Sequence, residues 1–204
     1  MKTLKFCKFA VFCALLFCVL PLHAELRRYR LDPVHTRVVF LIEHAGFSKS
    51  IGQALAPTGK LWWDLNAPER GRVEVEIDAM KIDFGDAGWN KAMQGKRYFN
   101  SKNFKTLSLK STAVRIGQGQ PNQGQFDALI TILGVQRKIT LDYTLNKSGN
   151  HPILPRAMLG FSARGTLKRS DFGMDYASDM IGDTVELWIE VEAGLDPEFK
   201  PGKK

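Results

Sequence analysis

The sequence predicts an all-β fold of antiparallel strands, arranged as a sandwich or a closed barrel. Apolar residues recur with a period of two along several segments, which is typical of strands with one buried and one exposed face. Turn-forming residues separate these segments, whereas a parallel sheet would need long helical crossovers. The chain has 204 residues, enough for one domain with a hydrophobic core.

Residues 1–24 are expected to form a cleavable secretory signal. Three lysines precede an apolar stretch from Phe9 to Leu20, and Ala24 provides a small residue at the cleavage point. An uncleaved membrane anchor is the less favoured alternative, because the stretch falls short of the ~20 residues of a spanning helix and Pro21 interrupts it. All three cysteines lie in this segment, so the rest of the chain has no disulfide and no thiolate ligand.

The rest of the chain is predicted to be one β-rich domain over residues 25–195 and a flexible tail over 196–204. The clearest strand-like runs occupy residues 34–47, 73–78, 107–110, 126–133 and 185–192. Turn sequences are expected at 56–59, 66–71, 117–124 and 146–152. Counting all candidates gives about eight strands.

One segment departs from this pattern. Trp89, Ala92 and Met93 recur at helical spacing, which predicts one short helix near residues 86–99 and an irregular loop around it. The tripeptide Asp-Phe-Gly occurs at 83–85 and again at 171–173. Without a glycine-rich loop or a His-Arg-Asp element it does not indicate a kinase. We expect each copy to turn a corner and bury its aromatic ring.

His35 and His44 flank the first strand and are the first candidates for a chemical site. They are nine positions apart, so on an unbulged strand they point to opposite faces and cannot bind one metal ion. His151 lies in a predicted turn, and no HExxH spacing is present. The sequence therefore predicts no metal site and no cofactor.

No catalytic residue is predicted either. The chain has no G-x-S-x-G element, and its closely spaced glutamates lie on exposed strand faces, where like charges are solvated. Three of the 29 Lys and Arg residues lie in the signal, so 26 basic residues accompany 21 acidic ones in the remainder. This charge is scattered along the chain, which argues against a nucleic-acid partner.

The most unusual feature is the amount of apolar surface on one face of so many strands. A barrel of about eight strands has an interior that is either filled by side chains or holds one slender ligand, and both alternatives stay open at this point. The candidate ligand-binding residues are Phe40, Ile42, His44, Phe47, Val75, Ile77, Met80, Leu109, Ile130, Ile132, Phe161, Leu187 and Ile189.

From Tyr29 to Ala193 the chain resembles the YceI-like proteins. Residues 31–36 read LDPVHT, similar to the family's Asp-Pro-x-His-Ser opening, and Phe40, His44, Gly52 and Gly59 follow at the family's spacing. The later matches are Ile130-Thr131-Ile132 before Gly134-Val135, RSDFGM at 169–174 and IGDTV at 181–185. The middle departs from the family: residues 88–112 lack its Arg-Asp and His-Leu pattern, and Leu133 replaces a histidine.

This resemblance implies an extended, eight-stranded, antiparallel, lipocalin-like barrel in the periplasm, with an apolar tunnel that takes a polyisoprenoid chain. The leading hypothesis is a non-catalytic carrier or sequestering protein for a long-chain amphiphilic lipid, polyisoprenoid or quinone-like, with His44 near the polar head. One alternative is a lipid-modifying enzyme that uses His44 or His35 as acid or base. Another is an interaction partner of a membrane electron-transfer protein, docked on it or on a membrane surface. Pairing of two barrels as a homodimer also stays open.

Overall fold

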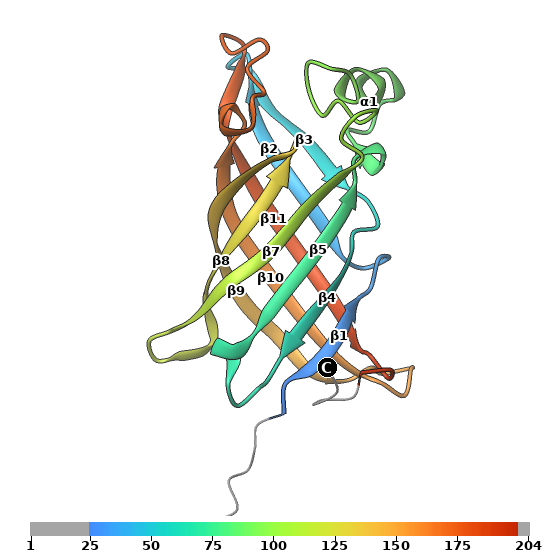
Figure 1. The fold of residues 1–204 in the computed structure, drawn as a ribbon, viewed down its shortest axis with the longest axis vertical. Coiled ribbons are helices and arrows are strands. Elements are labelled where there is room, and N and C mark those ends of the chain that lie inside the picture. The colour runs from blue at the N-terminus through green and yellow to red at the C-terminus, as the bar shows by residue number, and fades with distance from the viewer. Residues whose placement is uncertain (1–24, 200–204) are drawn as a thin grey trace, which may run out of the picture.

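Eleven strands form one continuous antiparallel sheet in the computed structural model, which describes residues 25–199 (Figure 1). They are β1 (Arg27–Leu31), β2 (Arg37–His44), β3 (Ser48–Ala54), β4 (Thr58–Trp63), β5 (Arg72–Asp78), β6 (Ile82–Asp83), β7 (Thr106–Gly117), β8 (Gln120–Ile132), β9 (Val135–Asn150), β10 (Ala157–Lys168) and β11 (Ile181–Leu195). The expected secretory signal, residues 1–24, lies outside the described residues.

The sheet closes into a barrel because β11 pairs with β10 on one side and with both β1 and β2 on the other. β1 and β2 are two parts of one interrupted strand that runs along β11. In the same way, β4 and β3 pair with β1 and β2, and β5 and β6 pair with β4 and β3. With each interrupted strand counted once, the barrel has eight strands in sequence order. The expected eight-stranded antiparallel barrel is confirmed.

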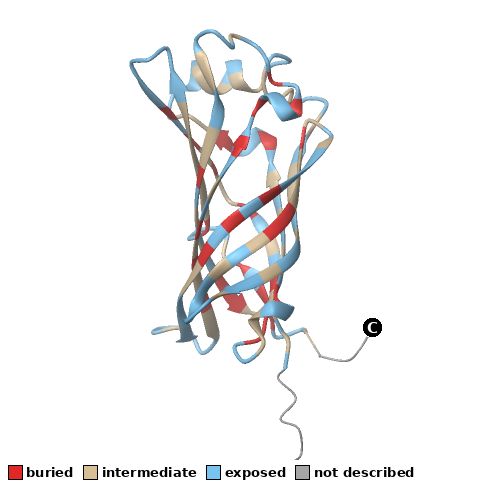
Figure 2. Ribbon diagram, turned by 90° about the vertical axis from the view of Figure 1, so that its left-hand side faces the viewer, coloured by how far each residue is buried: buried red, intermediate tan, exposed pale blue. Residues whose placement is uncertain are grey.

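The period-two pattern of the sequence corresponds to the inner and outer faces of this barrel. Along β5, Val73, Val75 and Ile77 are half-buried, whereas the residues between them are exposed. The same alternation of buried and exposed positions is visible along other strands in Figure 2. Since a strand projects successive side chains to opposite faces, the apolar set lines the interior and the charged set faces solvent.

The barrel interior contains two clusters of buried apolar residues. One is built around Tyr29, Trp63, Tyr143, Leu159 and Phe161 near the end of the barrel where β1 lies. The other, which includes Leu141, Leu167, Phe172, Met174 and Leu187, lies toward the opposite end. Both clusters are contacted by Phe126 and Ile189, so they are parts of one elongated interior.

Close packing inside the barrel explains why a glycine occupies position 52. Gly52 on β3 pairs with Phe40 on β2, and a Cβ atom at Gly52 would lie 2.4 Å from the Phe40 ring. The Phe84 ring makes an edge contact with Phe40, at 5.5 Å between centroids. An aromatic ring that covers a strand glycine in this way helps to fix the register of the two strands.

The predicted helix is present and is shorter than expected. Helix α1 spans Ala87–Met93, and the Asp86 side chain caps it by accepting a hydrogen bond from the Trp89 backbone N–H at 2.7 Å. The helix does not extend further, because Gly95 follows it and lowers helical propensity. Turns then lead the chain to β7. We call residues 84–105 the cap segment. It lies beside one end of the barrel (Figure 1).

Both Asp-Phe-Gly tripeptides turn a corner, as predicted. Gly85 and Gly173 have φ angles of 79° and 78°, in the left-handed region that glycine adopts without strain. Phe172 is buried in the interior, within the 3₁₀ helix η3 (Ser170–Phe172). The other 3₁₀ helices are η1 (Pro68–Arg70) and η2 (Ala79–Lys81).

Three predicted turns are wrong in extent. The turn expected at 56–59 ends at residue 57, since β4 begins at Thr58. The turn expected at 117–124 contracts to residues 118 and 119, because Gly119 adopts a φ of 69° and allows a tight hairpin between β7 and β8. The turn expected at 146–152 begins only after Asn150, since β9 continues to that residue. Residues 146–150 are all exposed, so their polar side chains are compatible with a strand that faces solvent.

The start of the predicted tail contacts the barrel. Asp196 is buried, its backbone N–H donates to the Arg28 carbonyl, and its carboxylate lies 2.7 Å from Arg28 Nε and 3.0 Å from Arg30 Nε. The guanidinium of Arg28 also lies 4.9 Å from the centre of the Phe199 ring. These contacts hold residues 196–199 against β1.

Candidate functional site

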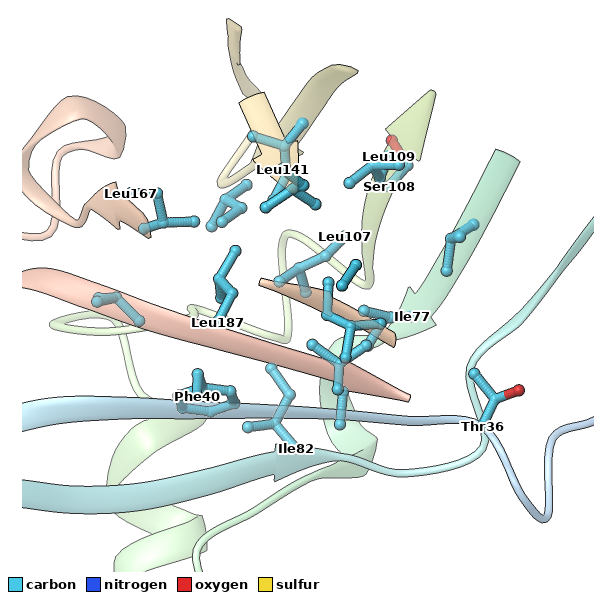
Figure 3. Close-up of a pocket in the computed structure, with 18 of the residues that line it drawn as sticks. Thr36, Phe40, Ile77, Ile82, Leu107, Ser108, Leu109, Leu141, Leu167 and Leu187 are labelled. Atoms are coloured by element: carbon cyan, nitrogen blue, oxygen red, sulfur yellow. The ribbon is translucent and has the colours of Figure 1, made fainter. Parts of the chain in front are cut away.

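An elongated apolar cavity runs through the interior of the barrel. Its volume is about 310 Å³, which falls within the range of about 300–1,000 Å³ for small-molecule pockets. Figure 3 shows Phe40, Ile77, Leu107, Leu141 and Leu187, which come from different strands and point toward a common space. The interior is therefore not completely filled by its own side chains, and it leaves space for a slender ligand.

The structure places eleven of the thirteen predicted ligand-binding residues on the wall of this cavity. These are Phe40, Ile42, His44, Val75, Ile77, Leu109, Ile130, Ile132, Phe161, Leu187 and Ile189. They come from β2, β5, β7, β8, β10 and β11, which surround the cavity. Alternation along each strand brings them together, because every second residue of a barrel strand faces the interior.

Phe47 and Met80 were predicted to face inward, and this is wrong. Phe47 is 92% exposed at the turn between β2 and β3, three residues beyond His44, the last residue of β2. Met80 is 54% exposed in η2, where the chain leaves the strand conformation after β5. In both cases the period-two pattern ends with the strand, so it cannot place the next apolar side chain.

The sequence-based prediction omitted several residues of the cavity wall. Leu141 and Tyr143 alternate with polar residues along β9, so the same periodicity was available to find them. Trp89 and Met93 line the cavity from α1. Their spacing of four shows that they share one helix face, but it cannot show that this face covers the barrel. Tyr98 and Phe99 line the cavity from the same cap segment without any periodic signal.

Aromatic side chains form the wall at the β1 end of the cavity. The Trp63 ring makes edge contacts with Tyr143 and Phe161, at centroid distances of 5.7 Å and 5.0 Å. Trp63 Nε1 and the Tyr143 hydroxyl are buried and have no hydrogen-bond partner within residues 25–199. An unpaired buried donor costs about 1–3 kcal/mol, a loss of stability that proteins often carry at functional sites.

Arg169 provides a buried cation on the cavity wall near the cap segment. It is 5% exposed, and its guanidinium donates hydrogen bonds to the backbone carbonyls of Gly182, Met174, Tyr176 and Ile181 at 2.5–2.9 Å. Because an arginine fork can serve several acceptors at once, one side chain fixes the loop between β10 and β11. We call the end of the cavity that Arg169, His44 and Tyr98 line its polar end; Arg72 and Ser111 also line the cavity, from β5 and β7.

The structure places the two strand-flanking histidines at opposite ends of β2. His44 is exposed at the cap end, where it lines the cavity and pairs with Ile181 of β11. His35 precedes β2, and its Nδ1 lies 3.3 Å from an Asp32 carboxylate oxygen and 4.0 Å from a Glu192 carboxylate oxygen. The two side chains therefore do not share a site.

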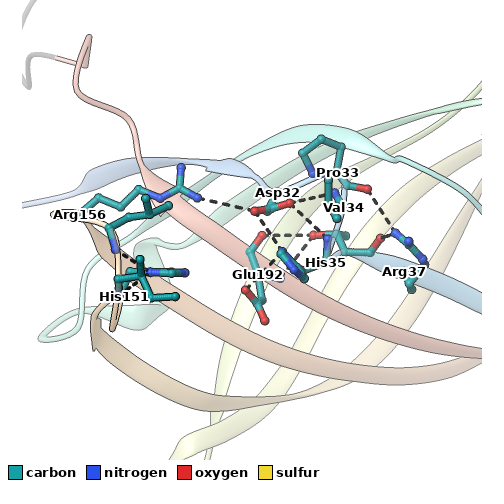
Figure 4. Close-up of polar contacts among 11 residues, drawn as sticks. Asp32, Pro33, Val34, His35, Arg37, His151, Arg156 and Glu192 are labelled. Atoms are coloured by element: carbon teal, nitrogen blue, oxygen red, sulfur yellow. Dashed lines mark hydrogen bonds and ion pairs between the residues drawn. The ribbon is translucent and has the colours of Figure 1, made fainter.

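His35 belongs to a surface network near the β9–β10 loop (Figure 4). Partial burial raises the pKa of the Asp32 carboxyl, but hydrogen bonds from the Val34 backbone N–H and from His35 outweigh it and hold this pKa below its ordinary value. Arg156 lies 3.6 Å from the same carboxylate. His151 Nδ1 instead accepts hydrogen bonds from two backbone N–H groups of its own loop, at 3.1 Å and 2.9 Å. This network stabilises one end of the barrel.

The described part of the chain contains neither a cluster of metal ligands nor a membrane-spanning helix. No group of three or more His, Cys, Asp or Glu side chains in residues 25–199 is arranged to hold a metal ion. Over the same residues, no helix combines the length and apolar character needed to cross a membrane.

Comparison with known proteins identifies relatives over almost the whole described chain. The model of the YceI-like domain matches residues 29–193. A UPF0312 protein of Serratia proteamaculans (strain 568) is 30% identical over 167 residues, which cover 80% of this chain and 84% of the relative. A UPF0312 protein of Yersinia pestis (strain Pestoides F) is 29% identical over the same length and with the same coverage.

Solved structures share the fold. BcnA of Burkholderia cenocepacia matches with a TM-score of 0.70 and 20% identity, covering 79% of this chain and 98% of that one. The YCEI protein of Campylobacter jejuni has a TM-score of 0.68 and 22% identity, covering 76% and 90%. A polyisoprenoid binding domain from Saccharophagus degradans has a TM-score of 0.58 and 12% identity, covering 84% and 100%. The match over residues 29–193 shows that the chain belongs to the YceI-like domain family.

Proposed function

We propose that this protein binds a long-chain amphiphilic lipid, polyisoprenoid or quinone-like, inside the barrel and carries or sequesters it without catalysis. The observation that carries the proposal is the apolar cavity of about 310 Å³, lined from every side by aliphatic and aromatic residues. The fold shared with a polyisoprenoid binding domain of Saccharophagus degradans is consistent with it. The expected secretory signal would export the protein, and the resemblance to the YceI-like proteins implies the periplasm as its destination.

The free energy of burial favours a long tail. Each buried methylene contributes ~0.8 kcal/mol, so roughly ten methylenes contribute ~8 kcal/mol and roughly twenty contribute ~16 kcal/mol. Association costs about 4–15 kcal/mol, and the free energy gained by burying a short tail does not clearly exceed this cost. Affinity should therefore rise with tail length until the cavity is full. An apolar wall distinguishes poorly between tails of similar width, which suits a carrier that accepts more than one lipid.

The polar head is expected at the cap end of the cavity. His44 is exposed there, and Arg169 and Tyr98 line the same region. The opposite end is lined by the buried rings of Trp63, Tyr143 and Phe161. An amphiphile that enters tail first would bury its chain among the apolar residues and leave its head beside these polar groups.

A pair of substitutions on β10 tests the proposal. Ala163 lines the cavity, so Ala163→Phe places a ring in the space that the tail would occupy. Thr166 is exposed, three residues away, and Thr166→Phe adds the same ring outside the barrel. Titration with a fluorescent long-chain lipid should show an affinity about tenfold lower or more for Ala163→Phe, because the ring occupies the space of the tail. A tenfold change corresponds to ~1.4 kcal/mol of binding free energy. The affinity of Thr166→Phe should be unchanged.

Circular dichroism and thermal melts establish that both variants are folded before the titration. Equal affinity in a folded Ala163→Phe variant would contradict binding inside the barrel. The enzyme alternative makes a different prediction, in which His44→Ala abolishes turnover of a lipid while lipid retention survives. Of the two histidines, His44 lines the cavity, whereas His35 pairs with Asp32 and does not line it.

A further inference from the structure

Exposed apolar side chains gather at the end of the barrel where the cavity reaches polar residues. Phe47 is 92% exposed at the tip of the β2–β3 hairpin. The Ala45 backbone N–H donates to the Met180 carbonyl at 2.6 Å, so this hairpin lies against the loop between β10 and β11. Met180 is itself 54% exposed. Phe47 and Met180 are therefore exposed on two segments that are joined by a backbone hydrogen bond, and exposed apolar side chains that cluster in this way mark interaction surfaces.

This apolar tip is continuous with the wall of the cavity. His44 and Ile181 pair across β2 and β11, and both line the cavity. Phe47 follows His44 by three residues, and Met180 directly precedes Ile181. A partner that contacts Phe47 and Met180 would therefore lie at the polar end of the cavity.

The cap segment joins the same surface. Arg97 donates a hydrogen bond to the Tyr176 hydroxyl at 2.9 Å, and its guanidinium lies 4.5 Å from the centre of the Tyr176 ring. The Tyr98 ring makes an edge contact with Tyr176 at 5.6 Å. These contacts connect the cap to the β10–β11 loop, so the apolar tip and the cap form one face of the molecule, which we call the docking face.

The charge of the cap segment is strongly positive. Residues 84–105 contain five basic side chains and one acidic one, Asp86. Four of the basic residues are exposed lysines: Lys91, Lys96, Lys102 and Lys105. The far end of the barrel differs, since Arg28, Arg30 and Arg156 lie within ion-pair distance of Asp196 or Asp32. Acidic residues of the docking face lie in the β10–β11 loop, at Asp171, Asp175 and Asp179, and beside the hairpin tip, where the Glu43 carboxylate accepts a hydrogen bond from the Gly46 backbone N–H.

We propose that the docking face binds the surface of an anionic lipid membrane, with Phe47 and Met180 inserted at the interface and the cap lysines on the head groups. Aromatic and aliphatic tips enter the boundary between head groups and acyl chains, and clustered lysines are attracted to anionic lipid. In this orientation the polar end of the cavity faces the bilayer, so a lipid can pass between the two without crossing water. Docking itself is independent of the proposed lipid binding, whereas exchange rests on it.

Vesicle flotation with paired variants tests the proposal. The purified protein is mixed with vesicles of phosphatidylglycerol and phosphatidylcholine, or of phosphatidylcholine alone. Lys96→Gln/Lys102→Gln is compared with Lys60→Gln/Lys147→Gln, which removes the same charge from exposed positions on β4 and β9. Phe47→Ser is compared with Ile153→Ser, because Ile153 is 85% exposed in the β9–β10 loop, away from the docking face.

The wild type should bind the anionic vesicles and lose this binding as salt is added. The cap variant should bind them roughly 25-fold more weakly, since each of the two basic residues near an anionic surface contributes roughly fivefold. Phe47→Ser should weaken binding as well, and both control variants should behave as the wild type. A wild type that does not float with anionic vesicles overturns the proposal, and so does an equal loss in the controls.

Two further outcomes separate this proposal from others. Cap-dependent binding to polyglutamate without vesicle binding would contradict a membrane and indicate an acidic protein as the partner. Lipid titration of Phe47→Ser should give the wild-type affinity, because Phe47 does not line the cavity. If docking is lost in Phe47→Ser and titration is unchanged, the docking face and the cavity are independent sites, as proposed.

Discussion

Asp127 on β8 shows how a single side chain ties neighbouring strands together on the outer face. Arg115 of β7 holds its carboxylate with two contacts of 2.8 Å, and Thr140 and Lys138 of β9 lie at 2.7 Å and 3.1 Å. The hydrogen bonds from Arg115 contribute most to holding the pKa of Asp127 well below its usual range, followed by those from Thr140 and Lys138. The ionised form is therefore favoured by folding.

This lowered pKa predicts a pH-dependent stability. Because the folded pKa lies below the unfolded one, ionised Asp127 stabilises the protein above the ordinary value of 3.8, and this contribution is lost as the pH falls through the folded pKa. Asp127→Asn should therefore lower the free energy of unfolding near neutral pH and have progressively less effect in acid. Urea unfolding of the wild type and of Asp127→Asn, from neutral to acidic pH, measures this difference in the free energy of unfolding. A difference that stays constant down to strongly acidic pH would show that charge is not the cause.

A matched control is available for this residue. Asp179 is exposed in the β10–β11 loop, and Asp179→Asn removes the same charge far from β8. Its effect on the free energy of unfolding should be small at every pH, since surface substitutions away from such networks usually change stability little. If Asp179→Asn reproduces the pH dependence of Asp127→Asn, net charge and not the Arg115 contacts accounts for it.

At the scale of the elements, the close approach of β4 and β5 depends on Gly59. An added Cβ atom would lie 2.2 Å from the Glu74 carbonyl oxygen, a backbone atom that cannot move without shifting β5. Gly160 on β10 is a suitable comparison, because the nearest atoms to an added Cβ there lie 4.0 Å away. Gly59→Ala should lower the free energy of unfolding by about 1–3 kcal/mol, and Gly160→Ala should leave it nearly unchanged. Urea unfolding of the two variants tests this, and equal values would contradict the packing argument.

Most of the elements could be predicted from the sequence where one face is apolar and the other charged. The residues of β5 and β11 alternate so regularly that Val75, Leu187 and Ile189 were correctly placed inside. The pattern fails at element ends, where Phe47 and Met80 follow the last paired residue and point to solvent. It also fails for the cap segment, because the packing of α1 over the barrel is a tertiary contact that no local period encodes.

The whole molecule combines a closed wall of paired strands with an interior that remains open. Trp63, Tyr143 and Phe161 line one end with edge-to-face contacts, and the cap segment covers the other with Trp89 and Phe99. The sequence predicted the barrel through its strand count and family resemblance. It could not decide between a filled and an open interior, because that depends on how large side chains from eight strands meet, and small differences in their volumes determine whether a space remains.

The central claim is that the barrel holds a hydrocarbon chain in this space, and organic extraction followed by mass spectrometry tests it most directly. Wild-type protein purified without detergent should release close to one long-chain amphiphile per barrel. The Ala163→Phe variant, prepared in parallel, should release much less, and Thr166→Phe should match the wild type. Extracts that contain no such lipid, or equal amounts from the wild type and Ala163→Phe, would contradict the claim.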